Sequence, residues 1–467
     1  MSRNPLRNIP SVGELLDSPP LRGLVDRISR NVAVSTAGKV LDELRTEVQT
    51  AAVEKTLPSV SDLAERIARR IVEHEAPPLR EVINASGILL HPALGGAPLA
   101  EEALEEVVSV AGNYASVEID LVSGDRSPRK TVVEDLLEEL TGAEAALVVG
   151  SGAGATMLAL SALAAGREVI VSRGQLVEMG DGYRLPDLIA ASGAVLREVG
   201  TTNSTRPDDY ARAIGDETAL MMLIHAADFF VAGLPADVAL EELIRLARRH
   251  KLPVIHDVDS AALIDLGEFG LADEPVVGES IKSGAELVIF SGDKLLGGPQ
   301  CGIIVGRKAL IERIERHPMA QALSVGRLTL SALAATLRLY RDKEKSVRTV
   351  PLLHLLSTSR ENLKNRAERL APQMAATAAI SEAEAVAGTA HLGGGPAPTR
   401  ELPSWCVALK PATMSIDRLA KSLRISAPSV IGAAQQDSLL LDLRGVLPRQ
   451  DLQLVAVVES LESEADR

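Results

Sequence analysis

The 467-residue chain is poor in cysteine and in aromatic residues and has no excess of positive charge. Its two cysteines, Cys301 and Cys406, exclude a disulfide framework and a cysteine-based zinc site, and they fit a reducing compartment. Aromatic residues are only 2% of the chain, which argues against a platform for stacking single-stranded nucleic acid. A net charge of −14 excludes an overall basic nucleic-acid binder. The first residues lack the apolar stretch of a secretory signal, so we expect a cytoplasmic protein.

One uncharged run, residues 145–166, has the length of a membrane-spanning helix. Its first part is a short β-type segment that ends in Gly150-Ser151-Gly152, and no second run of this kind accompanies it. A buried strand, a glycine turn and a buried helix explain the run better than a membrane span.

Residues 1–80 differ from the rest of the chain in charge and in predicted secondary structure. They carry 12 Lys or Arg and 11 Asp or Glu, whereas the remainder is strongly acidic. Ser11 and Glu14 form a capping-box pattern, and residues 41–53 and 61–72 have the periodicity of amphipathic helices. The arginines form two clusters: Arg22, Arg27 and Arg30, and Arg66, Arg69 and Arg70. These clusters are either solvated helix faces or part of a helical module that binds a polyanion.

The region after Pro77-Pro78 alternates β-type runs with helical runs, which predicts βαβ units and a mainly parallel sheet covered on both faces. The β-type runs are residues 147–149, 168–171, 196–199, 220–224, 254–257 and 287–290. A helix-rich stretch, residues 327–370, and a Gly/Pro-rich loop, residues 393–398, follow. We therefore predict a large α/β domain over residues 81–340 and a small α+β domain over residues 341–467.

The most informative stretch surrounds Lys294. A buried apolar run ends at Ser291 and delivers this lysine into a turn that contains Gly297-Gly298-Pro299. Burial favours the neutral amine, so a lysine at a strand end beside glycines is typical of a Schiff-base partner. The alternative is a surface lysine, but surface lysines rarely follow four apolar residues and precede Gly-Gly-Pro.

Two further strand ends carry polar groups that suit the same cofactor. Asp257 ends the run of residues 254–257, and Gly150, Ser151 and Gly152 join a strand to a helix whose N-terminus would suit a phosphate. Such a turn alone would also suit a dinucleotide. The order of glycine loop, aspartate and lysine, however, matches pyridoxal 5'-phosphate in an aspartate-aminotransferase-type fold (fold type I).

In that arrangement the loop binds the phosphate, together with Ser291, and Asp257 pairs with the pyridinium nitrogen. His225 follows another β-type run and is placed to stack on the ring or to contact its phenolic oxygen. A buried histidine with a purely structural role fits His225 nearly as well.

The sequence resembles the bacterial selenocysteine synthase family, the L-seryl-tRNA(Sec) selenium transferases, from its N-terminal to its C-terminal region. The runs that carry the resemblance are residues 7–16, 83–87, 171–178, 199–203, 290–300 and 439–444. The resemblance implies pyridoxal-phosphate-dependent conversion of seryl-tRNA(Sec) to selenocysteinyl-tRNA(Sec) with selenophosphate, through an aminoacrylyl intermediate. It also implies that Lys294 bonds the cofactor, that residues 1–80 bind the tRNA, and that the chain forms a homo-oligomer of dimers, such as a decamer.

The chain departs from the family's pattern at several positions near the expected site. Gln321 and Ser324 stand where the family has two arginines that would hold an anionic selenium donor, and Asp259 adds a carboxylate after Asp257. Arg126 and Arg129 match the family's other basic motif, so they are the candidates for an anion site.

The departures leave alternatives open. Arg126 and Arg129 could instead form salt bridges to Asp120 or Asp125 on a solvated loop. The chain could be a paralogue, a pyridoxal-phosphate lyase or β-eliminating enzyme that acts on a small amino acid or amino sugar. It could also be a tRNA-binding scaffold without activity, which the retained Lys294 and Asp257 disfavour.

Overall fold

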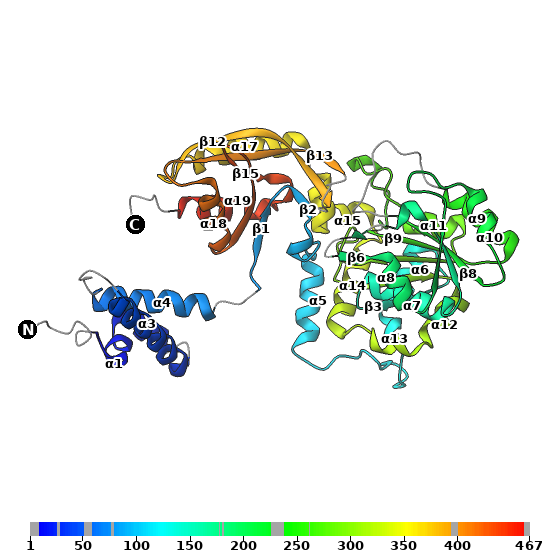
Figure 1. Cartoon of the computed structure of the whole chain (residues 1–467), viewed down its shortest axis with the longest axis horizontal. Helices are drawn as coiled ribbons and strands as arrows, with labels where there is room; N and C mark the ends of the chain where they lie inside the picture. The colour runs from blue at the N-terminus through cyan, green and yellow to red at the C-terminus, as the bar shows by residue number, and fades with distance from the viewer. Residues whose placement is uncertain are drawn as a thin grey trace, which may run out of the picture. The chain divides into compact units, whose positions relative to one another are not determined.

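The chain divides into two compact units, residues 1–81 and 82–467. The computed structural model describes residues 9–25, 29–50, 58–75, 79–176, 178–179, 182–225, 238–260, 262–393 and 400–461. Arg27, Pro77-Pro78 and nearly all of the predicted loop at 393–398 lie outside these residues. Figure 1 shows the elements along the chain.

The first unit is helical in its described part. Its helices are α1 (Val12–Leu16), α2 (Pro19–Val25), α3 (Arg30–Thr50) and α4 (Val60–Glu75). The predicted capping box is present: Ser11 Oγ accepts from the N–H of Glu14 at 3.3 Å, and the Glu14 carboxylate accepts from the N–H of Ser11 at 2.8 Å. Leucine, isoleucine and alanine side chains on the apolar faces of all four helices form one small buried core.

The second unit contains a seven-stranded sheet in the order β3-β11-β10-β9-β8-β4-β7. Its strands are β3 (Ala145–Val149), β4 (Glu168–Ser172), β7 (Val195–Val199), β8 (Thr218–Ile224), β9 (Val254–Asp259), β10 (Leu287–Ser291) and β11 (Gly302–Gly306). Only β11 runs antiparallel to its neighbours within this sheet. The six β-type runs predicted from the sequence are all strands here, and β11 is a seventh strand that the prediction lacked.

Alternate residues of each strand enter two different cores, one on each face of the sheet. Val288 and Phe290 of β10 face one core, and Leu287 and Ile289 face the other. The first core includes side chains of α6 (Glu134–Thr141), α10 (Leu240–His250), α11 (Val277–Ser283) and α14 (Arg327–Leu339). The second includes side chains of α7 (Gly152–Ala164), α8 (Leu185–Ala191) and α12 (Lys308–Glu315). Burial on both faces explains why these strands are continuous apolar runs.

Four further helices and one short ribbon complete the part of the unit around this sheet. They are α5 (Glu101–Ala111), α9 (Pro207–Ala213), α13 (Pro318–Ala322), α15 (Lys343–Thr349), and the hairpin of β5 (Glu178–Met179) and β6 (Tyr183–Arg184). The uncharged run at 145–166 is strand β3 followed by helix α7, as predicted. Among the described residues, no helix has the length and apolarity that crossing a membrane requires.

A second, six-stranded sheet has the order β1-β14-β15-β13-β12-β2. Its strands are β1 (Val82–Ala85), β2 (Ile88–Leu90), β12 (Ile380–Gly393), β13 (Glu401–Pro411), β14 (Ser429–Ala434) and β15 (Leu439–Asp442). The remaining helices are α16 (Pro351–Ser357), α17 (Arg360–Met374), α18 (Ile416–Ile425) and α19 (Asp451–Glu459). The α17, α18 and α19 side chains share a buried core with this sheet. The sequence also has strand-like runs at residues 405–409 and 439–443. The first lies within β13, and β15 covers the second as far as Asp442.

Strands β1 and β2 belong to the six-stranded sheet, whereas the sequence predicted that residues from 81 onward belong to the large domain. They pair in parallel with β14 and β12 at the two edges of the C-terminal sheet, as Figure 1 shows by the blue strands among orange and red ones. A short apolar run does not reveal which sheet it joins when its partner lies more than 300 residues away. The domain limits at 1–80, 81–340 and 341–467 otherwise stay predictions.

Candidate functional site

Four strands of the large sheet end at one edge, and each of them carries a predicted site residue. Strands β8, β9 and β10 are parallel neighbours, and β3 runs in the same direction because both β3 and β10 are antiparallel to β11. This edge therefore collects Gly150 after β3, His225 after β8, Asp257 in β9 and Lys294 after β10. Ligands of open α/β sheets bind at such an edge.

The glycine loop forms the N-terminus of helix α7. Ser151 is the N-cap, and its Oγ accepts from the N–H of Gly154 at 3.1 Å. The first N–H groups of a helix, here those of Gly152 and Ala153, have no intrahelical acceptor and favour an anion. A Cβ at Gly152 would come within 2.5 Å of Ser291 Oγ, so the loop and this hydroxyl are in close contact. The loop and the Ser291 hydroxyl therefore lie side by side and form one polar cradle; their binding of a phosphate stays a prediction.

Asp257 lies within a buried hydrogen-bond arrangement. Its Oδ2 accepts from Thr156 Oγ1 at 2.7 Å, and its Oδ1 accepts from the N–H of Asp259 at 3.3 Å. Burial raises the pKa of Asp257 to about 6, and the nearby Asp259 contributes to this rise. Both of these hydrogen-bond donors are neutral, so a protonated ring nitrogen would give this buried carboxyl a cationic partner. Thr156, which orients Asp257, was not assigned a role from the sequence.

Strand β9 contains an irregularity just before Asp259. Ile289 and Phe290 of β10 are consecutive, but their partners in β9 are Asp257 and Asp259, so Val258 is an extra residue in the ladder. Asp259 has a φ of +45°, in the left-handed region that L-residues rarely adopt. Its carboxylate oxygen Oδ2 accepts a hydrogen bond from Lys294 Nζ and forms an ion pair with it. The carboxylate that the sequence places near the ring thus contacts the predicted Schiff-base lysine directly.

The turn that carries Lys294 is closed by backbone hydrogen bonds. The N–H of Gly297 donates to the Lys294 carbonyl at 2.9 Å, and the N–H of Gly298 donates to the Gly292 carbonyl at 2.8 Å. The loop after β2 packs on the same turn, because the N–H of Ala97 donates to the Asp293 carbonyl at 2.8 Å. These bonds fix the position of the lysine backbone, so its amine reaches from a rigid support.

His225 is held by groups that the sequence analysis did not include. Its backbone N–H donates to the Asp257 carbonyl at 2.8 Å, and its Nε2 lies 3.5 Å from Oε2 of the fully buried Glu274 side chain. Nε2 is buried and makes no hydrogen bond within the described part of the chain. Arg400, which precedes β13, places its Nε 2.9 Å from Oε1 of Glu274. The C-terminal domain thereby contacts the His225 side of the site through one buried carboxylate.

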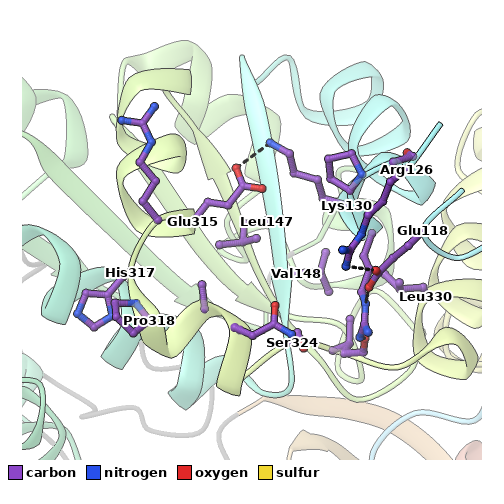
Figure 2. A pocket seen from close by; sticks show the side chains of 17 residues that line it. Glu118, Arg126, Lys130, Leu147, Val148, Glu315, His317, Pro318, Ser324 and Leu330 are labelled. Carbon is purple, nitrogen blue, oxygen red and sulfur yellow. Dashed lines mark hydrogen bonds and ion pairs between the residues drawn. The ribbon is translucent and has the colours of Figure 1, made fainter. Parts of the chain in front are cut away.

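The predicted anion-site arginines line a separate cavity of about 540 Å³. Four cationic side chains, those of Arg126, Arg129, Lys130 and Arg316, line it together with two carboxylates. Figure 2 shows Lys130 pointing toward Glu315. Arg126 and Arg129 both contact Glu118. Lys130 also lies 3.1 Å from Glu134, and Arg316 lies 3.5 Å from Glu312, so each of the four cations has a carboxylate partner with which an anion would compete.

Both arginines form ion pairs, but with Glu118 rather than with Asp120 or Asp125. Arg126 Nη2 lies 2.7 Å from Glu118 Oε2, and Arg129 Nε contacts Glu118 Oε1. Asp120 is engaged in its own turn, because its Oδ1 accepts from the N–H groups of Val122 and Ser123 at 2.8 Å. The ion-pair alternative is therefore present in the structure with a different carboxylate.

Gln321 and Ser324 line the same cavity and lie beside the glycine loop. The N–H of Gly150 donates to the Leu323 carbonyl at 2.9 Å, and Ser324 pairs with Val149 in an isolated β-bridge. The cavity and the cradle at α7 are therefore neighbouring parts of one region. Neutral side chains occupy the two positions where the resemblance implied arginines.

Comparisons with known proteins give one consistent result. A family model described as L-seryl-tRNA selenium transferase matches residues 82–447, and one described as selenocysteine synthase N terminal matches residues 6–45. An L-seryl-tRNA(Sec) selenium transferase of Moorella thermoacetica is 43% identical over 99% of this chain and 98% of its own length. The protein of the same name from Carboxydothermus hydrogenoformans is 40% identical over 95% of each chain.

A solved structure supports the fold. D-Glucosaminate-6-phosphate ammonia-lyase matches 83% of this chain and 97% of its own, with a TM-score of 0.57 and 19% sequence identity. At this identity the match shows the fold alone. With the family match and the mainly parallel sheet, the predicted α/β fold of the aspartate-aminotransferase type is confirmed.

Proposed function

The chain belongs to the L-seryl-tRNA selenium transferase family, and we propose that it converts seryl-tRNA(Sec) to selenocysteinyl-tRNA(Sec) with pyridoxal phosphate bound at Lys294. The observation that carries the proposal is the meeting of Lys294, Asp257 and the α7 N-terminus at one sheet edge of a chain that matches 98% of the length of a family member. Each of these groups matches a different part of the cofactor.

The residues present fit pyridoxal phosphate. The N–H groups of Gly152 and Ala153 and the Ser291 hydroxyl would bind its phosphate, and Asp257 would hold the proton on its ring nitrogen. The imidazole of His225, whose buried Nε2 lies 3.5 Å from Glu274 Oε2, would stack on its ring or contact its phenolic oxygen. When bound, the cofactor supplies an electron sink for the negative charge that develops when the Cα proton leaves.

The side chains then have separate tasks in the reaction. Lys294 Nζ would take the Cα proton of the seryl group once the substrate amine has replaced it. Asp257 would keep the ring nitrogen protonated, since its burial disfavours a carboxylate without a cationic partner. The β-hydroxyl would leave as water and the selenium of the donor would add at the β-carbon. Hydrolysis of the selenium–phosphorus bond would then release phosphate and leave selenocysteine.

We propose selenophosphate as the selenium donor and the cavity of Arg126 and Arg129 as its site. The cationic side chains of this cavity, and its contact with the glycine loop through Gly150 and Leu323, support the proposal. Glu118 competes with the donor for both guanidinium groups. Donor binding therefore requires the arginines to leave or to share this carboxylate.

We also propose that the first unit binds the tRNA. Arg30 and Arg69 are exposed on α3 and α4 and are free to face a polyanion in solution. Arg66 and Arg70 instead contact Glu43 in the same unit, so part of the second basic cluster is neutralised internally.

We propose as well that the chain forms a homo-oligomer built from dimers. Tyr114, Leu121 and Val122 are exposed apolar residues in the second unit and support this proposal.

The test is conversion of seryl-tRNA(Sec) by the purified protein with selenophosphate and pyridoxal phosphate. We expect selenocysteinyl-tRNA(Sec), and we expect the protein to absorb near the visible edge in a form that Lys294→Ala loses. A colourless protein would contradict the cofactor assignment. A coloured protein that eliminates from a free amino acid or amino sugar but leaves seryl-tRNA(Sec) unchanged would favour the paralogous lyase instead.

A further inference from the structure

We propose that Asp259 is a positioning residue that holds the amine of Lys294 as an ammonium ion in the cofactor-free protein, and again after the released amine has taken up the Cα proton. The inference rests on the proposed function, because Lys294 must have a carbonyl partner for its charge state to matter. The inference gives a role to the Asp259 carboxylate, which none of the reaction steps proposed above uses.

The geometry of β9 directs this carboxylate at Lys294. The extra residue Val258 turns the strand end, and Asp259 then adopts its φ of +45°. Irregularities of this kind re-aim side chains beside active sites. The result is a hydrogen-bonded ion pair in which both side chains are mostly shielded from solvent, with exposed fractions of 26% for Lys294 and 18% for Asp259.

The backbone conformation alone does not require an aspartate. Glycine adopts positive φ without a steric cost, and asparagine adopts it about as readily as aspartate. The second contact of Asp259, from its N–H to Asp257 Oδ1, uses only the backbone. Neither the positive φ after the extra residue in β9 nor the hydrogen bond to Asp257 therefore requires the carboxylate of Asp259.

Three carboxyl groups act on the Lys294 charge from the elements around it. Asp257 and Asp259 come from β9, and Asp293 precedes the lysine in its own turn. Burial raises the pKa of Asp257 to about 6 and also raises the pKa of Asp293. Asp259 makes the direct contact with the amine.

Asp259 contacts the amine of Lys294 both before this amine bonds an aldehyde and after a substrate amine has replaced it. For Lys294 to bond an aldehyde, its ammonium gives one proton to the Asp259 carboxylate. The neutral amine then adds to the carbonyl carbon, and loss of one water leaves a C=N bond. When a substrate amine replaces Lys294, the released neutral amine takes up the Cα proton, and the resulting ammonium pairs with Asp259.

The experiment measures how the full-length protein, freed of cofactor, captures pyridoxal phosphate as a function of pH. Capture is followed by absorbance and by the mass of the borohydride-reduced adduct on Lys294. We expect Asp259→Asn and Asp259→Gly to lower the pH midpoint by about one unit, which is about tenfold faster capture below the midpoint. Asp265→Asn, at an exposed carboxylate that caps its own turn, is the matched control and is expected to leave the midpoint unchanged.

The two variants separate charge from backbone. Both lack the carboxylate, whereas only glycine relieves the positive φ, so equal shifts in both support the proposal. An unchanged midpoint in Asp259→Asn overturns it, as does a folded variant that captures no cofactor at any pH. If the unaltered protein itself captures none, the proposed function fails rather than the role of Asp259.

Discussion

Replacing Arg129 by alanine is expected to weaken binding of an anionic selenium donor far more than the same change at Arg126. The two arginines share Glu118, but their surroundings differ. The Arg129 side chain is 38% exposed and also donates from Nη1 to the Val325 carbonyl at 3.1 Å. The Arg126 side chain is 85% exposed. Arg129 is therefore held by two contacts before an anion arrives, whereas the charge of Arg126 is largely solvated.

The size of the effect follows from this difference. A charge-assisted hydrogen bond contributes about 1.5–3 kcal/mol when its groups are partly shielded, and an exposed ion pair about 0.2–1 kcal/mol. Since about 1.4 kcal/mol corresponds to a tenfold change, Arg129→Ala is expected to raise the apparent KM for selenophosphate roughly 10- to 100-fold. Arg126→Ala is expected to raise it no more than about fivefold.

The assay is the initial rate of selenocysteinyl-tRNA(Sec) formation against selenophosphate concentration at saturating seryl-tRNA(Sec). Cofactor absorbance and the unfolding temperature are measured alongside, and both are expected to stay unchanged. Glu118→Gln serves as a control that removes the competing carboxylate but keeps both guanidinium groups, so its KM is expected to fall. An unchanged KM in Arg129→Ala, or a larger effect at Arg126, would refute the assignment of this cavity.

Three further outcomes are expected. Because burial raises the pKa of Asp257 to about 6, the stability that its protonated form contributes is present below about pH 4 and is lost as the pH rises through 6. Thermal unfolding of the cofactor-free protein should show this loss. Asp257→Asn should not show it, and this variant should still bind the cofactor but lose most activity. Deleting residues 1–80 should abolish tRNA binding in a filter assay and keep the cofactor spectrum, since β1 begins at Val82. Light scattering should give at least a dimer, and a monomeric mass would contradict the oligomer proposal.

The sequence was sufficient to locate the groups at the sheet edge. Strand β10 is an apolar run that ends at the turn of Lys294, and the buried start of β9 leads to Asp257 within that strand. A buried run followed by a polar residue is visible in a single sequence. The same signal marked the glycine loop after β3. These residues are close in space because parallel strands share their carboxyl edge, which the alternation of strands and helices already implied.

Contacts that depend on backbone detail or on distant pairing could not be predicted. The extra residue in β9, which aims Asp259 at Lys294, depends on its register with β10. Glu274 lies in a polar loop and has no pattern that marks it as buried beside His225. Glu118 was missed because Asp120 and Asp125 are nearer to the arginines in sequence, whereas the hydrogen bonds of Asp120 within its turn decide which carboxylate remains available.

The pairing of β1 with β14 has a consequence for biosynthesis. Val82 pairs with Ser429, so the first strand of the C-terminal sheet leaves the ribosome long before its partner is translated. At about 5–20 residues per second, the delay is roughly 20–70 s. All strands of the large sheet lie between residues 145 and 306, so this sheet can form during that delay. The segment at 82–90 must meanwhile remain unpaired on the nascent chain, where a chaperone or the large domain itself has to shield its apolar side chains from other chains.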